Sequence, residues 1–127
     1  MRRLRIGVLA SGRGTNLQAL IDASREGRLL GDVVIVLSDV ADATALERAR
    51  KAGIEARYID PGRKGARLSK ESEARYIEAL EASKVDLIAL AGFMRILSSE
   101  FVRHFRWKIL NIHPSLLPAF PGLRAQK

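Results

Sequence analysis

The sequence of 127 residues contains no cysteine, and this absence excludes several kinds of site. Without a thiol, the chain can form no disulfide, no thiolate metal centre and no cysteine nucleophile. A secretory signal is also absent, because Arg5 and the polar residues 11–14 bound the short apolar run 6–10. No other run approaches the roughly 20 apolar residues of a membrane span. We therefore expect a cytoplasmic protein that does not contact a membrane.

Aromatic residues are scarce, at 6% of the chain, whereas basic residues are plentiful and give a formal net charge of +8. A basic surface attracts anions of many kinds. Nucleic-acid binding usually combines basic residues with aromatic residues or a zinc motif, and neither pattern is present. The densest basic run, residues 63–67, is therefore interpreted as a solvated loop. We expect no nucleic-acid partner.

Apolar runs alternate with segments of helical periodicity along the chain. Strands are predicted at residues 4–10, 33–37, 56–59, 85–91 and 109–112, and helices begin near Thr15, Asp42, Ser69 and Ser98 or Ser99. This order predicts an α/β fold, with an open, mainly parallel, twisted sheet and helices on both faces. Residues 1–127 are expected to form one domain that is incomplete at its C-terminal end. The uncovered fifth strand would then favour self-association through the sheet edge.

Two details of the helices can be predicted from residue spacing. Thr15 and Gln18 have the spacing of a capping box at the start of the first helix. In the third helix, Ser69 is expected to cap the N-terminus, and the residues placed on the buried face are Ala74, Ile77 and Leu80.

The first candidate functional segment is residues 10–17, which read ASGRGTNL between a predicted strand and a predicted helix. Glycines let an anion approach the unpaired N–H groups of a helix's first turn, and Thr15 and Asn16 can add side-chain hydrogen bonds. Anion binding is favoured over a turn without a ligand. The dinucleotide pattern would need a third glycine in place of Leu17, and a P-loop lysine is absent. Asp39, after the second strand, could hold a ribose, so NAD binding remains an alternative.

The second segment, residues 91–97, reads AGFMRIL and follows the predicted fourth strand. The apolar side chains that could line a pocket for a flat heterocycle are Phe93, Met94, Ile96 and Leu97. Core packing is the simpler explanation from the sequence alone, and Met94 and Leu97 also have helical spacing.

The third segment contains Asn111 and His113, which lie on the same side of an extended chain. Pro114 disfavours helix at His113 and so helps to keep that geometry. A carboxamide beside an imidazole suits reaction at a carbonyl, where the amide stabilises an oxyanion and the imidazole transfers a proton. A structural histidine remains an equal alternative. No metal is expected, because no second histidine or carboxylate lies at ligand spacing.

Together these segments resemble the phosphoribosylglycinamide formyltransferase family. The matching stretches are residues 8–21, 91–98 and 111–118, and residues 46–49 and 53–54 also match, so the resemblance covers essentially the whole chain. The N-x-H pattern alone is shared with methionyl-tRNA formyltransferase and formyltetrahydrofolate deformylase. The H-P-S continuation and the G-T-N loop favour the enzyme that acts on glycinamide ribonucleotide.

The resemblance implies a Rossmann-like fold and transfer of a formyl group from the co-substrate 10-formyltetrahydrofolate to the amine of glycinamide ribonucleotide, in purine synthesis. It implies phosphate binding by Gly14, Thr15 and Asn16, and catalysis by Asn111 and His113. The folate-binding residues would be Met94, Arg95, Ile96, Leu97, Asn111 and Lys70. The family's third catalytic residue, an aspartate, would lie beyond residue 127, so we expect little or no transferase activity from the 127-residue chain alone. A deformylase, a methionyl-tRNA formyltransferase and a non-catalytic nucleotide-binding module remain alternatives.

Overall fold

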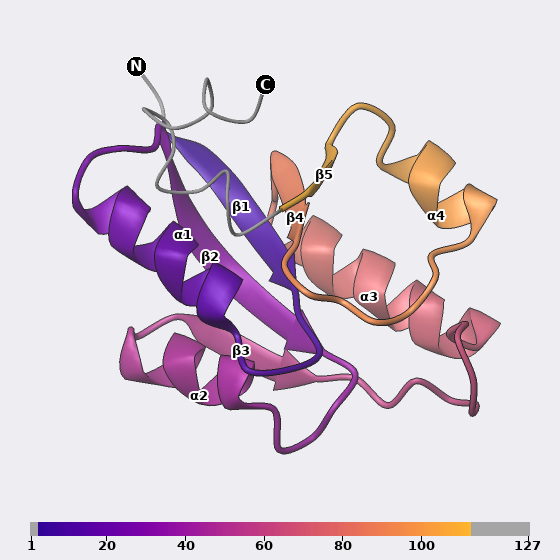
Figure 1. The fold of residues 1–127 in the computed structure, drawn as a ribbon. Coiled ribbons are helices and arrows are strands. Elements are labelled where there is room, and N and C mark those ends of the chain that lie inside the picture. Colours follow the sequence, from indigo (N-terminus) through magenta and orange to yellow (C-terminus); the bar gives the residue numbers. More distant parts are fainter. Residues whose placement is uncertain (1–2, 113–127) are drawn as a thin grey trace, which may run out of the picture.

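The structure is a computed structural model that describes residues 3–112. Strands and helices alternate along this range in the predicted order (Figure 1). The strands are β1 (Leu4–Leu9), β2 (Gly31–Ser38), β3 (Glu55–Tyr58), β4 (Leu87–Leu90) and β5 (Ile109–Asn111). The helices are α1 (Thr15–Arg25), α2 (Thr44–Lys51), α3 (Lys70–Ala82) and α4 (Ser99–His104).

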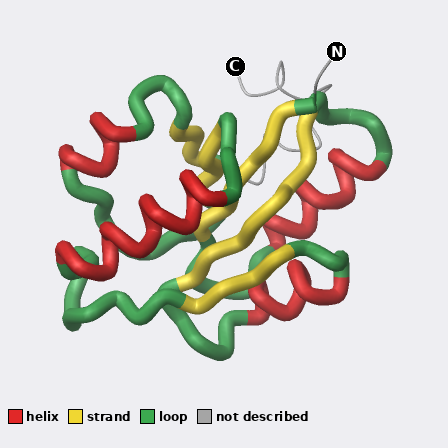
Figure 2. Tube along the Cα trace, turned by 180° about the vertical axis from the view of Figure 1, so that it is seen from behind, coloured by secondary structure: helices red, strands yellow, loops and turns green. Residues whose placement is uncertain are grey.

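The strands lie side by side in one sheet (Figure 2). Their order is β3-β2-β1-β4-β5, and every pairing within residues 3–112 is parallel. The direction in which strands are added reverses at β1, which pairs with β2 on one side and β4 on the other. In an open parallel sheet, such a reversal creates a crevice beyond the C-terminal ends of the two central strands. The loops after β1 and β4 therefore occupy the position where a ligand site is expected.

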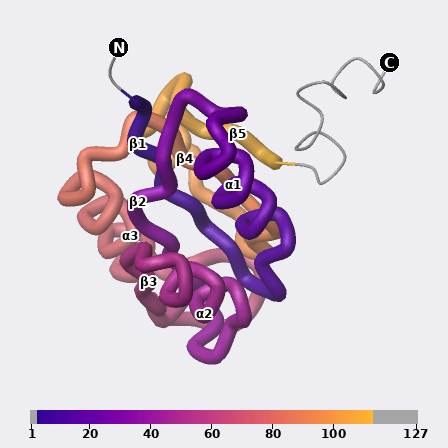
Figure 3. The backbone as a smooth tube through the Cα atoms, turned by 90° about the vertical axis from the view of Figure 1, so that its left-hand side faces the viewer, coloured from indigo at the N-terminus to yellow at the C-terminus, as the bar shows by residue number. Residues whose placement is uncertain are grey.

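Helices cover both faces of the sheet, which confirms the predicted fold class (Figure 3). One core cluster packs α1 and α2 against one face, and a second packs α3 and α4 against the other. Along β1 the side chains alternate between them, because Val8 belongs to the first cluster and Leu9 to the second. A central strand covered on both faces has to be apolar on both, which explains its continuous apolar run.

Gly7 in β1 permits the close approach of α3 to the sheet. A Cβ atom at this position would lie 2.7 Å from Cδ2 of Leu80 and 3.0 Å from Cγ1 of Val85. Carbon atoms in van der Waals contact are about 3.5–4.0 Å apart, so a larger side chain would have to displace its neighbours. The small residue in β1 thus sets the distance between sheet and helix.

The capping box predicted for α1 is wrong. The N-cap residue is Gly14, in a left-handed conformation with φ of 77°, and no side chain caps the helix. Thr15 is the first helical residue, one position too late to act as the cap. The Gln18 side chain instead donates to Asp22 at 3.0 Å. The N-terminus of α1 is therefore left without a side-chain acceptor.

The start of α3 was predicted correctly, and so was the burial of Leu80, but Ala74 was placed on the wrong face. Ser69 is the N-cap, and its side chain accepts a hydrogen bond from the N–H of Ser72, as expected. Ala74 is exposed, whereas Tyr76 is completely buried. Residues 72, 76, 79 and 80 form the buried stripe, which is rotated away from Ala74. The ring of Tyr76 packs edge-on against Phe93 from the β4–α4 loop, a contact that periodicity within α3 does not encode.

Candidate functional site

The loops that follow β1 and β4 meet through Ser11. Its N–H donates to the carbonyl of Gly92 at 3.3 Å, and its hydroxyl accepts from the N–H of Met94 at 2.8 Å. The segment 11–16, which we call the anion loop, therefore lies beside the β4–α4 loop, residues 91–98. The fold brings together two of the segments that the sequence singled out.

A buried ion pair lies beside the contact between these two loops. The side chain of Asp39 is 3% exposed, and its carboxylate accepts from Nε of Arg95 at 2.7 Å and from the Ser11 hydroxyl at 2.6 Å. Arg95 also donates to the carbonyl oxygens of Arg63, at 3.3 Å, and Gly65. Both carboxylate oxygens of Asp39 are thus engaged with protein, and the side chain is almost completely buried, which disfavours the contact with a ribose that the NAD interpretation required.

The β4–α4 loop divides its apolar side chains between solvent and core. Met94 and Ile96 are 75% and 51% exposed. Phe93 and Leu97 are half-buried and pack against the cluster formed with α3 and α4. This alternation is that of an extended segment, so the helical spacing noted for Met94 and Leu97 has no structural counterpart. Met94 and Ile96 remain available to contact a ligand, whereas Phe93 and Leu97 support the loop.

Tyr76 lies close to the buried ion pair and is itself completely buried. Its hydroxyl has no hydrogen-bond partner among the described residues. Burial raises the pKa of Tyr76 well above its usual value, and the nearby Asp39 carboxylate raises it further. The phenol therefore stays protonated and neutral at physiological pH.

The anion loop ends at the exposed start of α1. The first-turn N–H groups have no partner within the helix, and no side chain caps them. Thr15 is exposed, so its hydroxyl can reach a bound molecule. Unpaired N–H groups and the helix dipole both favour a negative charge at this position.

Asn16 connects the anion loop to the end of β5. Its Nδ2 donates to the carbonyl of Ile112 at 3.4 Å, across 96 positions of sequence. Asn111, the preceding residue, is exposed at the end of β5. The proposed partner of Asn111, His113, lies outside the described residues. The start of α1 and the beginning of the N-x-H segment are therefore in direct contact.

Lys70 is exposed and is the first residue of α3. The loop before it is attached to the β4–α4 loop, because the N–H of Ile96 donates to the carbonyl of Ala66 at 2.7 Å. An isolated bridge between Arg67 and Ile96 strengthens this attachment. Lys70 thus begins a helix whose preceding loop contacts the β4–α4 loop.

Sequence reasoning did not identify two residues that fix these loops, Ser11 and Arg48. Ser11 bridges Asp39 and Met94, and Arg48 donates to the carbonyl of Arg13 at 2.7 Å. Their partners lie 28 to 83 positions away in the sequence, so no local pattern marks them.

Neither a metal cluster nor a membrane-spanning helix is found within residues 3–112. No group of three histidine, cysteine, aspartate or glutamate side chains there is placed to hold a metal ion. None of the helices in that range is long and apolar enough to cross a membrane.

Comparison with known proteins gives a consistent result. The family described as formyl transferase matches residues 4–127. The chain is 45% identical over 124 residues to phosphoribosylglycinamide formyltransferase of Escherichia coli (strain K12), covering 98% of this chain and 58% of that protein. It is 48% identical over 128 residues to the trifunctional purine biosynthetic protein adenosine-3 of Drosophila melanogaster, covering 99% of this chain and 9% of that protein.

A solved structure has the same fold. Glycinamide ribonucleotide transformylase 1 from Symbiobacterium toebii superposes with a TM-score of 0.79 at 54% identity, covering 98% of this chain and 58% of that one. The chain thus spans little more than half of the single-function relatives that it matches.

Proposed function

The chain belongs to the formyl transferase family, and on that basis we propose that the protein transfers a formyl group from 10-formyltetrahydrofolate to the amine of glycinamide ribonucleotide. The names of the similar proteins favour this reaction, a step of purine synthesis, over deformylation. The contact between Asn16 and Ile112 carries the proposal, because it joins an anion-binding helix start to the segment that contains Asn111. A phosphate ester bound at α1 could thereby place its amine beside that residue.

The substrate phosphate is assigned to Gly14, Thr15 and Asn16. The N–H groups at the start of α1 supply donors with partial positive charge. The exposed Thr15 hydroxyl and the second N–H of the Asn16 carboxamide would add hydrogen bonds. The other end of the ribonucleotide would extend toward β5.

The folate is assigned to the β4–α4 loop together with Asn111 and Lys70. Met94 and Ile96 offer exposed apolar surface of the kind that contacts a flat pterin ring. The guanidinium of Arg95 is held by Asp39, so Arg95 would contribute backbone groups instead of its charge. Leu97 would support the loop from the core. Lys70 would attract the carboxylates of the glutamate tail.

The chemistry assigned to Asn111 and His113 is a nucleophilic acyl transfer. The substrate amine attacks the formyl carbon, and a new C–N bond forms as the carbonyl oxygen becomes an oxyanion. Hydrogen bonds from Asn111 and His113 would stabilise that oxyanion. A proton then passes from the amine to the folate nitrogen, the original C–N bond breaks, and tetrahydrofolate leaves.

The test is a formyl-transfer assay on the protein expressed from its complete gene. Formylated ribonucleotide should form only when both substrates are present. Asn111→Ala should lower kcat by about 10²–10³, the usual effect of removing one oxyanion donor. The control Lys108→Ala changes an exposed residue beside β5 and should leave the rate unchanged. Release of formate in the absence of the ribonucleotide would instead identify a deformylase. Formylation of methionyl-tRNA would identify a methionyl-tRNA formyltransferase.

A further inference from the structure

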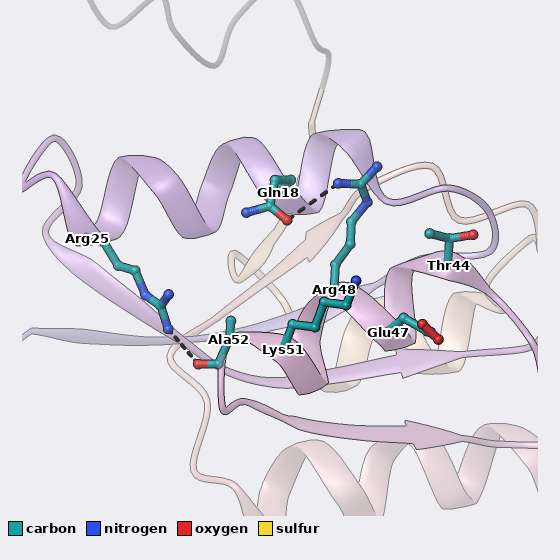
Figure 4. A pocket seen from close by; sticks show the side chains of 7 residues that line it. All are labelled: Gln18, Arg25, Thr44, Glu47, Arg48, Lys51 and Ala52. Carbon is teal, nitrogen blue, oxygen red and sulfur yellow. Dashed lines mark hydrogen bonds between the residues drawn. The ribbon is translucent and has the colours of Figure 1, made fainter.

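Arg48 on α2 contacts the anion loop through its side chain. Its Nε donates to the carbonyl of Arg13 at 2.7 Å, and a terminal nitrogen donates to the side-chain oxygen of Gln18 at 3.4 Å. Figure 4 shows the Arg48 side chain extending from α2 toward the beginning of α1. One side chain thus links α2 to both the loop and the helix that the loop begins.

Ala45, one turn earlier on α2, fixes the same loop at two further positions. Its N–H donates to the carbonyl of Gly12 at 3.1 Å. A Cβ atom on Gly14 would lie 2.7 Å from the Cα of Ala45, so only glycine fits against the helix. The φ of 77° at Gly14 also favours glycine. Three successive loop residues are therefore held against α2.

These contacts determine where the loop's N–H groups point. In a trans peptide, the carbonyl and the N–H of one plane point in opposite directions. The carbonyl oxygens of Gly12 and Arg13 face α2, so the N–H groups of Arg13 and Gly14 point away from it. Successive N–H groups turned to one side form a concave set of donors that suits an anion.

We propose that Arg48 is a positioning residue for the substrate phosphate. It holds the carbonyl of Arg13 and thereby keeps the donor at Gly14 aimed at the phosphate, without touching the substrate itself. The inference rests on the proposed function, because the anion is taken to be the phosphate of the ribonucleotide. Lysine at this position would keep the positive charge but lose the planar fork that reaches Arg13 and Gln18 together. Arg48→Lys therefore distinguishes the effect of holding the loop in position from the effect of a nearby positive charge.

The experiment uses the protein from the complete gene with the variants Arg48→Met and Arg48→Lys. Arg50→Met is the matched control, because Arg50 is exposed on the same helix and no side-chain hydrogen bond joins it to the described residues. If the Gly14 N–H is no longer aimed at the phosphate, one charge-assisted hydrogen bond to the ligand is lost, which corresponds to about a tenfold change in affinity. We expect Arg48→Met to raise the Kd for inorganic phosphate and the KM for glycinamide ribonucleotide by that factor.

Three readouts separate this role from a general loss of structure. The KM for 10-formyltetrahydrofolate should stay within about twofold, because the β4–α4 loop does not contact Arg48 among the interactions described. Arg48→Lys should be intermediate, and Arg50→Met should match the wild type. The backbone amide resonances of Arg13 and Gly14 should move on phosphate titration of the wild type and respond more weakly in Arg48→Met.

Two results would overturn the inference alone. One is phosphate binding by Arg48→Met that equals the wild type. The other is an Arg48→Lys protein that binds like the wild type while Arg48→Met does not, because charge would then suffice. If the wild type fails to bind glycinamide ribonucleotide, the proposed function falls and the inference with it. Should Arg48→Met not fold, Arg48→Gln, which retains a neutral donor, is measured in its place with the same expectation of weaker binding.

Discussion

Replacing Asp39 by alanine removes one partner of the buried ion pair between Asp39 and Arg95. Arg95 would keep its bonds to the carbonyls of Arg63 and Gly65 but lose the only carboxylate within reach among the described residues. The Ser11 hydroxyl would lose its acceptor at 2.6 Å. A charge and a hydroxyl would therefore remain largely buried with fewer partners.

The size of the effect follows from these contacts. Breaking a buried ion pair by removing one partner costs about 3–5 kcal/mol. The Arg95 side chain is 18% exposed and retains carbonyl partners, so water can compensate part of the loss. We therefore expect Asp39→Ala to lower the free energy of unfolding by about 3 kcal/mol. Asp39→Asn keeps the volume and one acceptor, and should cost about half as much, roughly 1.5 kcal/mol.

Urea denaturation of the protein from the complete gene, followed by circular dichroism, measures this change. Asp42→Ala is the control, because Asp42 is exposed in the same connection between β2 and α2. It should stay within about 0.5 kcal/mol of the wild type. The double variant Asp39→Ala with Arg95→Met should cost less than the sum of the single variants. If the free energy of unfolding of Asp39→Ala lies within about 1 kcal/mol of the wild-type value, the ion pair of Asp39 and Arg95 does not stabilise the fold as argued.

Three smaller changes test other parts of the fold. Gly7→Ala should destabilise the protein by about 1–3 kcal/mol in urea denaturation, because the added Cβ would lie 2.7 Å from Leu80; an unchanged midpoint would show that α3 is not held this closely. Burial raises the pKa of Tyr76 above its ordinary 10.0, so the folded state is stabilised below that pH and loses stability as the pH rises above it. Tyr76→Phe removes a buried hydroxyl that has no hydrogen-bond partner among the described residues, so it should gain about 1 kcal/mol at neutral pH. Because phenylalanine cannot ionise, the variant should also lose less stability than the wild type above pH 10; parallel curves would contradict this. The hydrogen bond from Arg3 lowers the pKa of Asp32 below 3.8, so the stability that this exposed pair contributes is present above that pH and is lost as the pH falls through the lowered value. Asp32→Asn should accordingly cost at most about 0.5 kcal/mol at neutral pH and nothing in strong acid, as thermal unfolding would show.

The order of the strands and helices could be predicted from the amino-acid sequence, because the signals for them are local. Apolar runs mark strands that are covered on both faces, and a serine directly before a segment of helical periodicity marks the N-cap of a helix. The caps at Ser69 and Ser98 are examples, since each accepts from a backbone N–H three positions later. The location of the candidate segments at strand ends followed from the same local pattern.

Which of those strand ends meet, and which side chains hold them, depends on contacts between segments far apart in the chain. The pair of Arg95 and Asp39 spans 56 positions, and the contact of Arg48 with the Arg13 carbonyl spans 35. The position of Tyr76 was likewise missed, because packing against another segment sets how far a helix is rotated about its axis. Such contacts depend on the strand order of the sheet, and no periodicity within one segment encodes that order, because it arises from pairings between segments far apart in the chain.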